Sequence, residues 1–430
     1  MNTNNTAGAA ASASRPFYMR NYMILSLEGG LFMGGLAFTD ANSVLPRLME
    51  VLGSPSWVIS IMPTLMIFGI TFPAVLTAHI IEGLPHVKKY LVITGIFQRI
   101  PYLFVGLALV LMPDADPTLL IMLVVACPLF SGLSGGITIT AFQELVGKSI
   151  PPMRMASVFA VRNIIRVTIG LCSGGVVLYV LEKYPGVYGY GILHLITFFF
   201  LAISYMVFIM VRETNDHSRK NQQPISFRKN IRLMPKILYS DKRYRHYLFN
   251  CIAGLSMFCM LPFFAIYVLR VTGRPDSFMG VLVTTQMAGG ITGNIFSGYT
   301  GDRFGSKIAV VGTRIVFILA CFWTLFASTE IELSAIMFLI GFVYFADFTS
   351  RNAFSYEIIP LEKRATYFAI RGFLCASFMV IFSVFGSAIW DWSGQNIKHC
   401  TAAACAGAII SLFFILQIKN PRPLNTENHL

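Results

Sequence analysis

The chain has 430 residues, of which 55% are hydrophobic and only 12% are charged. A soluble domain carries about 25% charged residues, so this composition excludes a soluble protein and indicates an integral membrane protein. The net charge of +13 would suit nucleic-acid binding, but the placement of the basic residues explains it without such a partner. The eight cysteines form no C-x-x-C pair, so neither a metal site nor a disulfide framework is indicated.

Twelve segments are long and apolar enough to span a membrane, which needs about 20 residues. They are residues 22–45, 57–81, 90–112, 118–146, 158–181, 189–211, 246–269, 277–299, 308–327, 333–356, 366–390 and 400–417. The predicted organisation is a disordered cytoplasmic N-terminus (1–21), a six-helix bundle (22–211), a basic cytoplasmic linker (212–245), a second six-helix bundle (246–417) and a cytoplasmic tail (418–430).

The distribution of lysine and arginine predicts the orientation of the chain. One set of loops, which includes both termini and the linker, holds 22 basic residues, and the opposite set holds five: Arg47, Lys183, Arg270, Arg274 and Lys398. Since positive charge accumulates on the cytoplasmic side, both termini are predicted to be cytoplasmic. The six basic residues that remain are all arginines inside predicted spans: Arg99, Arg162, Arg166, Arg314, Arg351 and Arg371.

One stretch of sequence occurs twice. Residues 151–162 read P-P-M-R-M-A-S-V-F-A-V-R and residues 360–371 read P-L-E-K-R-A-T-Y-F-A-I-R. Both copies lie in a polar gap and run into an apolar segment that carries a buried arginine, Arg162 or Arg371. Two similar halves are typical of repeat-built membrane transporters.

A glycine-rich motif lies between the eighth and ninth spans. Residues 298–307 read G-Y-T-G-D-R-F-G-S-K, in which the glycines permit a tight turn and Asp302 is expected near a helix N-terminus. This stretch resembles the loop motif G-x-x-x-D-R-x-G-x-K of the major facilitator superfamily. The superfamily's other copy, between helices two and three, is degraded here to residues 82–89, where Glu82 stands in for the aspartate.

The resemblance covers the whole chain through helix count, halves and loop lengths, and is nearest to poorly characterised bacterial members. It implies an all-α integral membrane protein with twelve transmembrane helices in two six-helix bundles, located in the cell (inner) membrane. It also implies that charges at the cytoplasmic ends lock the outward-facing state, the alternative being that they only orient the loops. The residues concerned are Gly298, Gly301, Asp302, Arg303, Gly305, Lys307, Glu82, Glu357 and Arg364.

Ionisable residues inside the first span are candidates for the transport site, because a charge in the bilayer core costs at least about 2.5–3.5 kcal/mol. Glu28 shares a helical face with Gly35, Thr39 and Asn42, which suits a cavity wall. Since the superfamily's first helix lines the cavity, Glu28 is the first candidate for proton coupling. The alternative is a structural ion pair with an arginine. Asp40, near the outer end, suits a helix-end or gate role at least as well as substrate contact.

Other embedded charges lie in the tenth, fifth and eleventh spans. Asp347 and Arg351 are four residues apart and can pair along one helical face near Tyr344, as a switch or as a static pair. Arg162 and Arg371 are interpreted as gate charges or as contacts for an anionic substrate. Their expected partners are Glu82 or Glu144 for the first, and Asp302 or Glu357 for the second.

The sequence therefore predicts a secondary active transporter that moves a small organic solute by alternating access, with protons as the coupling ion. The alternatives are proton-driven efflux of lipophilic compounds, and a transporter-shaped receptor or scaffold. No H-E-x-x-H pattern and no G-x-x-x-x-G-K-[ST] loop occurs, so neither an enzyme nor ATP coupling is expected. No cofactor or metal is predicted, and the expected partners of this monomeric chain are its substrate, protons and membrane lipid.

Overall fold

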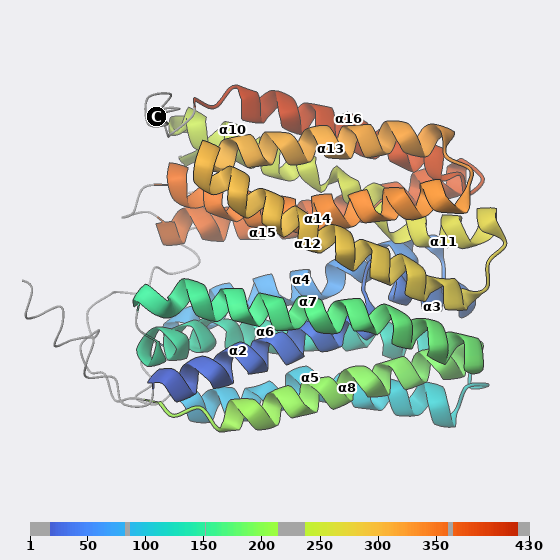
Figure 1. Cartoon of the computed structure of the whole chain (residues 1–430), viewed down its shortest axis with the longest axis horizontal. Coiled ribbons are helices and arrows are strands. Elements are labelled where there is room, and N and C mark those ends of the chain that lie inside the picture. The colour runs from blue at the N-terminus through green and yellow to red at the C-terminus, as the bar shows by residue number, and fades with distance from the viewer. Residues whose placement is uncertain (1–17, 82–86, 151, 214–236, 360–363, 420–430) are drawn as a thin grey trace, which may run out of the picture. The chain divides into compact units, whose positions relative to one another are not determined.

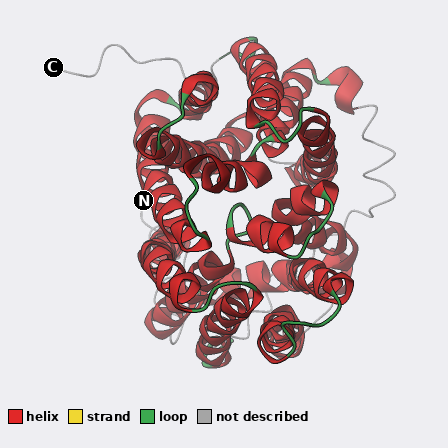
Figure 2. Cartoon of the chain, turned by 90° about the vertical axis from the view of Figure 1, so that its right-hand side faces the viewer, coloured by secondary structure: helices red, strands yellow, loops and turns green. Residues whose placement is uncertain are grey.

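The structure is a computed structural model that describes residues 18–81, 87–150, 152–213, 237–359 and 364–419. These residues are almost entirely helical, and within the described ranges there is no strand (Figure 2). The all-α fold class expected from the apolar segments is therefore confirmed. Charged residues are too sparse for a water-facing surface, and helices satisfy every backbone hydrogen bond internally, as a bilayer requires.

The helices follow the predicted spans closely (Figure 1). They are α2 (Tyr18–Gly35), η1 (Leu36–Thr39), α3 (Val44–Val51), α4 (Ser56–Ile81), α5 (Val87–Leu111), α6 (Pro117–Ser149), α7 (Pro152–Lys183), α8 (Val187–Ile209), α10 (Lys242–Gly254), η2 (Leu255–Cys259), α11 (Leu261–Thr272), η3 (Asp276–Phe278), α12 (Met279–Phe304), α13 (Ser306–Phe326), α14 (Glu330–Ile358), α15 (Arg364–Trp392) and α16 (Ile397–Leu416).

Ten helical segments among the described residues are long and apolar enough to cross a membrane. The other two predicted spans are also helical. In α4 the described apolar stretch is shorter, Ser56–Thr71. In α12 glycines, threonines and a glutamine dilute the apolar residues. Each of the twelve predicted spans thus corresponds to helix.

The first and seventh spans are broken, although the sequence analysis treated each as one continuous helix. The first changes from α2 to the short 3₁₀ segment η1, and α3 begins only after a turn. The seventh changes from α10 to η2 and then α11, where Pro262 in the first turn has no N–H for a preceding carbonyl. Short 3₁₀ stretches inside long helices often mark hinges. The helical wheel that placed Thr39 and Asn42 on one face with Glu28 was therefore wrong, because α2 ends at Gly35.

The chain forms two compact units. Unit 1 comprises residues 1–39, 65–172 and 188–226, and unit 2 comprises residues 40–64, 173–187 and 227–430. In unit 1, α2, α5 and α8 run side by side (Figure 1), and their inner faces share an apolar core with α6 and α7. Unit 2 has its own apolar core between α10, α13, α14, α15 and α16. The organisation into six-helix bundles at residues 22–211 and 246–417 remains a prediction from the sequence.

Close helix contacts in unit 2 depend on glycine. A Cβ atom at Gly289 would lie 1.9 Å from the carbonyl oxygen of Phe338, and one at Gly341 would lie 2.1 Å from that of Gln286. Both distances are shorter than any real contact, so α12 and α14 touch through their backbones. Small residues permit this approach in membrane helices, where apolar burial alone cannot drive helices together.

Candidate functional site

Buried charges gather in two clusters, one in each unit. The Glu28 cluster consists of Glu28, Arg99 and Arg162 in unit 1, and the Asp347 cluster consists of Asp347, Arg314 and Arg351 in unit 2. Each cluster has one carboxylate between two guanidinium groups. They differ in the closeness of the pairing and in what surrounds the charges.

In the Glu28 cluster the carboxylate is paired loosely. Glu28 lies on α2 and is 5% exposed. Its carboxylate oxygens lie 3.6 Å from NH2 of Arg99 on α5 and 3.9 Å from NH1 of Arg162 on α7. Charge-assisted hydrogen bonds of this kind are about 2.7–2.9 Å long, and Oε2 of Glu28 is buried without a hydrogen bond among the described residues. The contacts are therefore electrostatic rather than short hydrogen bonds.

The Arg99 guanidinium is held in place by the backbone. Its Nε donates to the carbonyl oxygen of Leu201 at 3.0 Å, and NH1 donates to that of Gly95 at 2.7 Å. The group also lies 5.2 Å from the ring centres of both Phe32 and Tyr205, within the range of a cation–π interaction. Arg99 is therefore a fixed positive charge beside Glu28.

The Arg162 guanidinium has no such anchoring. Among the described residues its donors make no hydrogen bond, and its contacts are the ion pair to Glu28 and the ring of Phe142 at 5.2 Å. The side chain lies against the backbone of α2 at Gly29, where a Cβ atom would be 1.7 Å from its Nε. Glycine at this position makes room for Arg162 beside Glu28. The sequence analysis had placed Glu82 or Glu144 beside this arginine. Glu144 instead pairs with Lys148 at 3.2 Å, and Glu82 lies outside the described residues.

A cavity of about 120 Å³ adjoins the cluster within unit 1. Its polar groups are Glu28, Arg99, Arg162, Gln98 and Thr138, and its other walls are mainly apolar. The apolar lining is Phe32, Met33, Met66, Ile70, Leu91, Ile139, Phe142 and Phe208. One water needs about 10–15 Å³ measured this way, so the space accepts several waters or a small organic group. Converging polar groups in an apolar pocket are typical of ligand sites.

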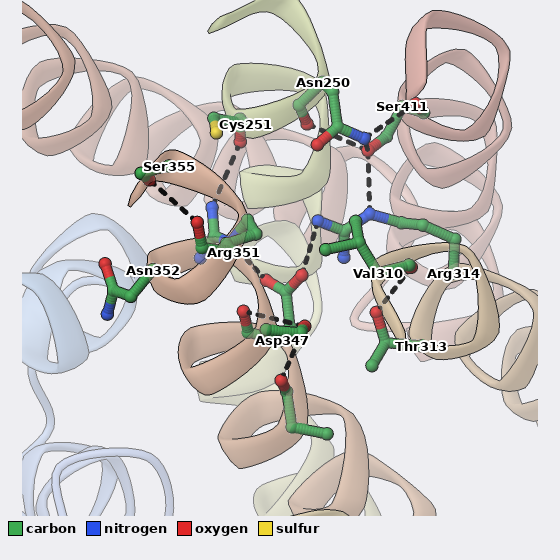
Figure 3. Close-up of polar contacts among 12 residues, drawn as sticks. Asn250, Cys251, Val310, Thr313, Arg314, Asp347, Arg351, Asn352, Ser355 and Ser411 are labelled. Atoms are coloured by element: carbon green, nitrogen blue, oxygen red, sulfur yellow. Dashed lines mark hydrogen bonds and ion pairs between the residues drawn. The ribbon is translucent and has the colours of Figure 1, made fainter. Parts of the chain in front are cut away.

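The Asp347 cluster is paired tightly (Figure 3), and Asp347 and Arg314 are almost completely buried, whereas 17% of the Arg351 side chain is exposed. Oδ1 of Asp347 lies 2.7 Å from NH2 of Arg314, and Oδ2 lies 2.7 Å from Nε of Arg351. Side-chain exposure is 2% for Asp347 and 1% for Arg314. Each carboxylate oxygen thus has its own arginine, and the i,i+4 contact predicted for Asp347 and Arg351 is present.

Neighbouring polar groups complete the Asp347 cluster (Figure 3). Nε of Arg314 donates to Oγ of Ser411 at 2.7 Å, and Nδ2 of Asn250 donates to the same oxygen at 2.8 Å. NH1 of Arg351 donates to the carbonyl of Cys251 at 3.4 Å. Tyr344, expected near this face, is half-buried and packs edge-on against Phe345. The sequence analysis identified Arg314 as intramembrane but missed it as the second partner of Asp347.

Arg371, the repeat partner of Arg162, donates hydrogen bonds from two of its nitrogens. NH1 donates to the hydroxyl of Tyr247 at 2.9 Å and to Ser355, and NH2 donates to Oδ1 of Asn352 at 2.8 Å. The prediction that Asp302 or Glu357 would meet this arginine was therefore wrong. The partners that it meets are neutral groups on α10 and α14.

Asp40 closes the turn between η1 and α3. Its Oδ2 accepts the N–H of Asn42 and the hydroxyl of Ser43, both at 2.9 Å. These local bonds satisfy backbone and side-chain donors before α3 begins at Val44. Of the two roles considered for Asp40, the geometry supports the helix-end role.

The glycine-rich motif forms the junction of α12 and α13. The helix α12 continues through Asp302 and Arg303, and Gly305 has φ +93°, which permits the sharp turn into α13. Asp302 is exposed in the last turn of α12, so its expected position at a helix N-terminus was wrong. Lys307 donates to the carbonyl of Ile418 at 2.5 Å, and Oε1 of Glu357 accepts from Ser306 at 2.9 Å. The backbone of Arg364 begins α15.

The sequence did not predict a chain of alternating charges in unit 2, which consists of Asp276, Arg47, Glu50 and Arg270. Arg47 contacts Asp276 at 2.7 Å and also pairs with Glu50, and Glu50 in turn pairs with Arg270. The chain links α3 to α11 and η3. The signal in the sequence is the i,i+3 spacing of Arg47 and Glu50, which lie in one of the predicted loops that hold few basic residues.

The helical fold and the apolar spans define a multi-spanning membrane protein with embedded ion clusters. Residues 247–429 match the family model of the Major Facilitator Superfamily. Synaptic vesicle glycoprotein 2A of Rattus norvegicus is 27% identical over 137 residues, which are 32% of this chain and 18% of that protein. Synaptic vesicle glycoprotein 2B of Mus musculus is 25% identical over 186 residues, 40% of this chain and 25% of that protein. The chain thus spans about a fifth to a quarter of the length of these curated relatives.

Solved structures show the same fold over nearly the whole chain. The D-xylose-proton symporter superposes with a TM-score of 0.69 at 12% identity, covering 95% of this chain and 99% of that one. A mutant of the nucleoside transporter NupG gives 0.68 at 12% identity, covering 93% and 98%. The match over residues 247–429 and this shared fold agree with the resemblance to the Major Facilitator Superfamily that the sequence motif predicted. These comparisons support a secondary transporter rather than an enzyme.

Proposed function

We propose that the chain is a proton-coupled secondary active transporter that moves a small organic solute by alternating access, with Glu28 as the proton-binding group. The observation that carries this proposal is the loosely paired, buried carboxylate of Glu28 beside a cavity. A buried charge is costly in a membrane and is retained where it has a function.

The geometry of Glu28 suits reversible protonation. Its nearest arginine nitrogens are 3.6 and 3.9 Å away, so a proton can bind without breaking a short hydrogen bond to either arginine. Asp347 is a poorer candidate, because each of its oxygens is in contact with an arginine at 2.7 Å and only 2% of its side chain is exposed. The proton therefore belongs with Glu28 in this proposal, and the pair of Asp347 and Arg351 is a static element.

The broken first and seventh spans support alternating access. Glu28 lies on α2, one to two turns before the helix ends, and the Asp347 cluster contacts α10 just before η2 begins. Discontinuous helices beside embedded charges are a recurring feature of transporter binding sites. The loop charges place both termini on the cytoplasmic side of the cell membrane in this proposal. The residues of the α12–α13 junction then form the cytoplasmic gate.

The test uses purified protein in vesicles that contain a pH-sensitive dye. A panel of organic anions, neutral sugars, nucleosides and organic cations is added outside, and the internal pH is recorded. Solute-dependent proton movement is expected for the native chain. Glu28→Gln, which resembles the protonated carboxyl group, should abolish proton movement but retain exchange of labelled solute. Glu144→Gln, outside the cluster, is the matched control. Full proton-driven transport by Glu28→Gln would contradict the proposal.

Efflux of lipophilic compounds by proton antiport is the second candidate. The observation that favours it is the apolar lining of the cavity, with Met33, Met66, Phe142 and Phe208. The same assay separates the two directions of coupling. Symport acidifies the vesicle interior when solute is added outside, whereas antiport makes it more alkaline. A receptor or scaffold would move neither solute nor protons and would tolerate the loss of Glu28.

A further inference from the structure

We infer that the cavity beside Glu28 binds a small organic anion, whose carboxylate takes the Arg162 guanidinium while a proton neutralises Glu28. This inference rests on the proposed proton-coupled function and adds the substrate class. Proton and anion would enter together, so the loaded cavity has the same net charge as the empty one.

The first support is the balance of charge in the cluster. Two guanidinium groups face one carboxylate in the wall of the cavity. When Glu28 accepts a proton, two positive charges remain in a low-dielectric site, where attraction to an anion is stronger than in water. A cationic solute would meet the reverse situation, since Arg99 and Arg162 would both repel it.

The second support is the difference between the two arginines. Two nitrogens of Arg99 donate hydrogen bonds to the carbonyl oxygens of Leu201 and Gly95. Arg162 has no hydrogen bond among the described residues, and 17% of its side chain is exposed. A guanidinium with free donors presents the planar fork that binds a carboxylate through two parallel hydrogen bonds. Arg162 is therefore the group that meets the anion, and Arg99 holds Glu28 in place.

The surroundings of Glu28 leave it as the proton acceptor of the site. The charged or titratable groups that face it are Arg99 from α5 and Arg162 from α7, and Tyr205 of α8 stacks on Arg99. The elements α4 and α6 contribute Met66, Ile70, Thr138 and Phe142 to the cavity, none of which titrates. Proton binding to Glu28 and anion binding to Arg162 must then favour each other reciprocally.

The walls define the rest of the substrate. Phe32, Met33, Phe142 and Phe208 line a space of about 120 Å³, somewhat less than the cavity of about 150 Å³ that holds a benzene molecule. The anion that fits best has one carboxylate and a compact apolar body no larger than a benzene ring. A sugar or nucleoside has more hydroxyl groups than Gln98 and Thr138 could satisfy.

The test uses three probes of the same shape: benzoate (anionic), benzamide (neutral) and benzamidinium (cationic). Binding to purified full-length protein is measured by calorimetry and by thermal shift between pH 6 and pH 8, where benzoate stays ionised because carboxylic acids titrate near pH 4. We expect benzoate alone to bind, with affinity rising up to about tenfold per pH unit as the pH falls, because one proton is taken up with each anion.

Variants assign the binding to the named groups. Arg162→Gln should weaken benzoate about 30-fold or more, as for truncation of a buried charge pair, and Arg162→Lys about tenfold because the fork is lost. Glu28→Gln should bind benzoate tightly at pH 8 and lose the pH dependence. Gly29→Ala should weaken binding by displacing Arg162, whose Nε is 1.7 Å from the added Cβ position. Gly175→Ala on α7, with no atom within 4 Å of the added Cβ, is the matched control.

Equal binding of benzamide or benzamidinium, or no binding of benzoate at either pH, would overturn the assignment of an anion. Benzoate binding that survives Arg162→Gln would overturn the role of Arg162. Proton movement in vesicles with a neutral or cationic solute would refute the inference while the proposed function stands. Benzoate binding without proton movement for any solute would instead refute the proposed function.

Discussion

The Glu28 and Asp347 clusters contain the same kinds of groups, one carboxylate and two arginines, but they differ in geometry. Glu28 lies on the first span of its half, 3.6 and 3.9 Å from its arginines and beside a cavity. Asp347 lies on the fourth span of its half, 2.7 Å from both partners and enclosed by packed helices. Short contacts on both oxygens hold Asp347 against its arginines, whereas the carboxylate of Glu28 has only long contacts and adjoins a cavity.

The repeat-related arginines show the same difference. Arg162 and Arg371 end the two copies of the repeated stretch, and each reaches the first helix of its own half. Arg162 meets the carboxylate of Glu28, but Arg371 meets the hydroxyl of Tyr247 and the amide of Asn352. The repeat thus places an arginine at the same position in both halves. The two arginines differ in their partners, a carboxylate for Arg162 and neutral groups for Arg371.

The strongest test of this comparison is the removal of each carboxylate's charge. Asp347→Asn leaves Arg314 and Arg351 buried and uncompensated, which should cost about 3–5 kcal/mol of stability. Glu28→Gln loses no hydrogen bond to an arginine and should cost much less. Denaturant unfolding of the purified variants measures both. Equal destabilisation would mean that the Glu28 cluster is also structural.

Truncating the two repeat-related arginines sharpens the comparison. Arg371→Gln removes donors from Tyr247, Ser355 and Asn352, and each buried acceptor left unsatisfied costs about 1–3 kcal/mol. Arg162→Gln removes no hydrogen bond among the described residues, so its unfolding midpoint should stay near that of the native chain. A larger loss for Arg162→Gln than for Arg371→Gln would reverse the assignment of roles.

The chain of alternating charges that includes Arg47 and Asp276 consists of ion pairs that are partly exposed to water. Side-chain exposure is 22% for Arg47 and 20% for Asp276. Asp276→Asn should therefore lower stability by only about 0.2–1 kcal/mol, and salt should diminish the effect. Unfolding at low and high ionic strength measures this. A loss as large as that of Asp347→Asn would show that depth in the fold does not determine the strength of these pairs.

The exposed carboxylate of the α12–α13 junction should have the smallest effect on stability. Asp302→Asn is expected to stay within about 0.5 kcal/mol of the native chain, as is usual for surface positions. If Asp302 belongs to the cytoplasmic gate, the rate of solute exchange in vesicles should nevertheless change. Unaltered stability together with unaltered exchange would leave Asp302 only the role of orienting the loop.

Much of the fold and one contact of the Asp347 cluster could be predicted from sequence. Hydrophobic length located all twelve helices, because a bilayer-spanning helix is specified by local composition. The i,i+4 spacing predicted the pair of Asp347 and Arg351, since both lie on one helix. The partners on other helices were missed or misplaced. Arg99 was not linked to Glu28, and Arg371 was assigned carboxylates that it does not contact, because these contacts depend on helix rotation and close packing.

By itself the sequence determined that this chain is an all-helical membrane protein, since apolar length and loop charge are local properties, and the repeated arginine stretch predicted two related halves. Only the tertiary structure decided which carboxylate is loosely held. Gly29 lets Arg162 lie against α2 beside Glu28, and backbone carbonyls hold Arg99 at a distance that no spacing rule predicts. The physical reason is that a buried charge depends on groups far away in sequence, and their distances are set by how the helices pack.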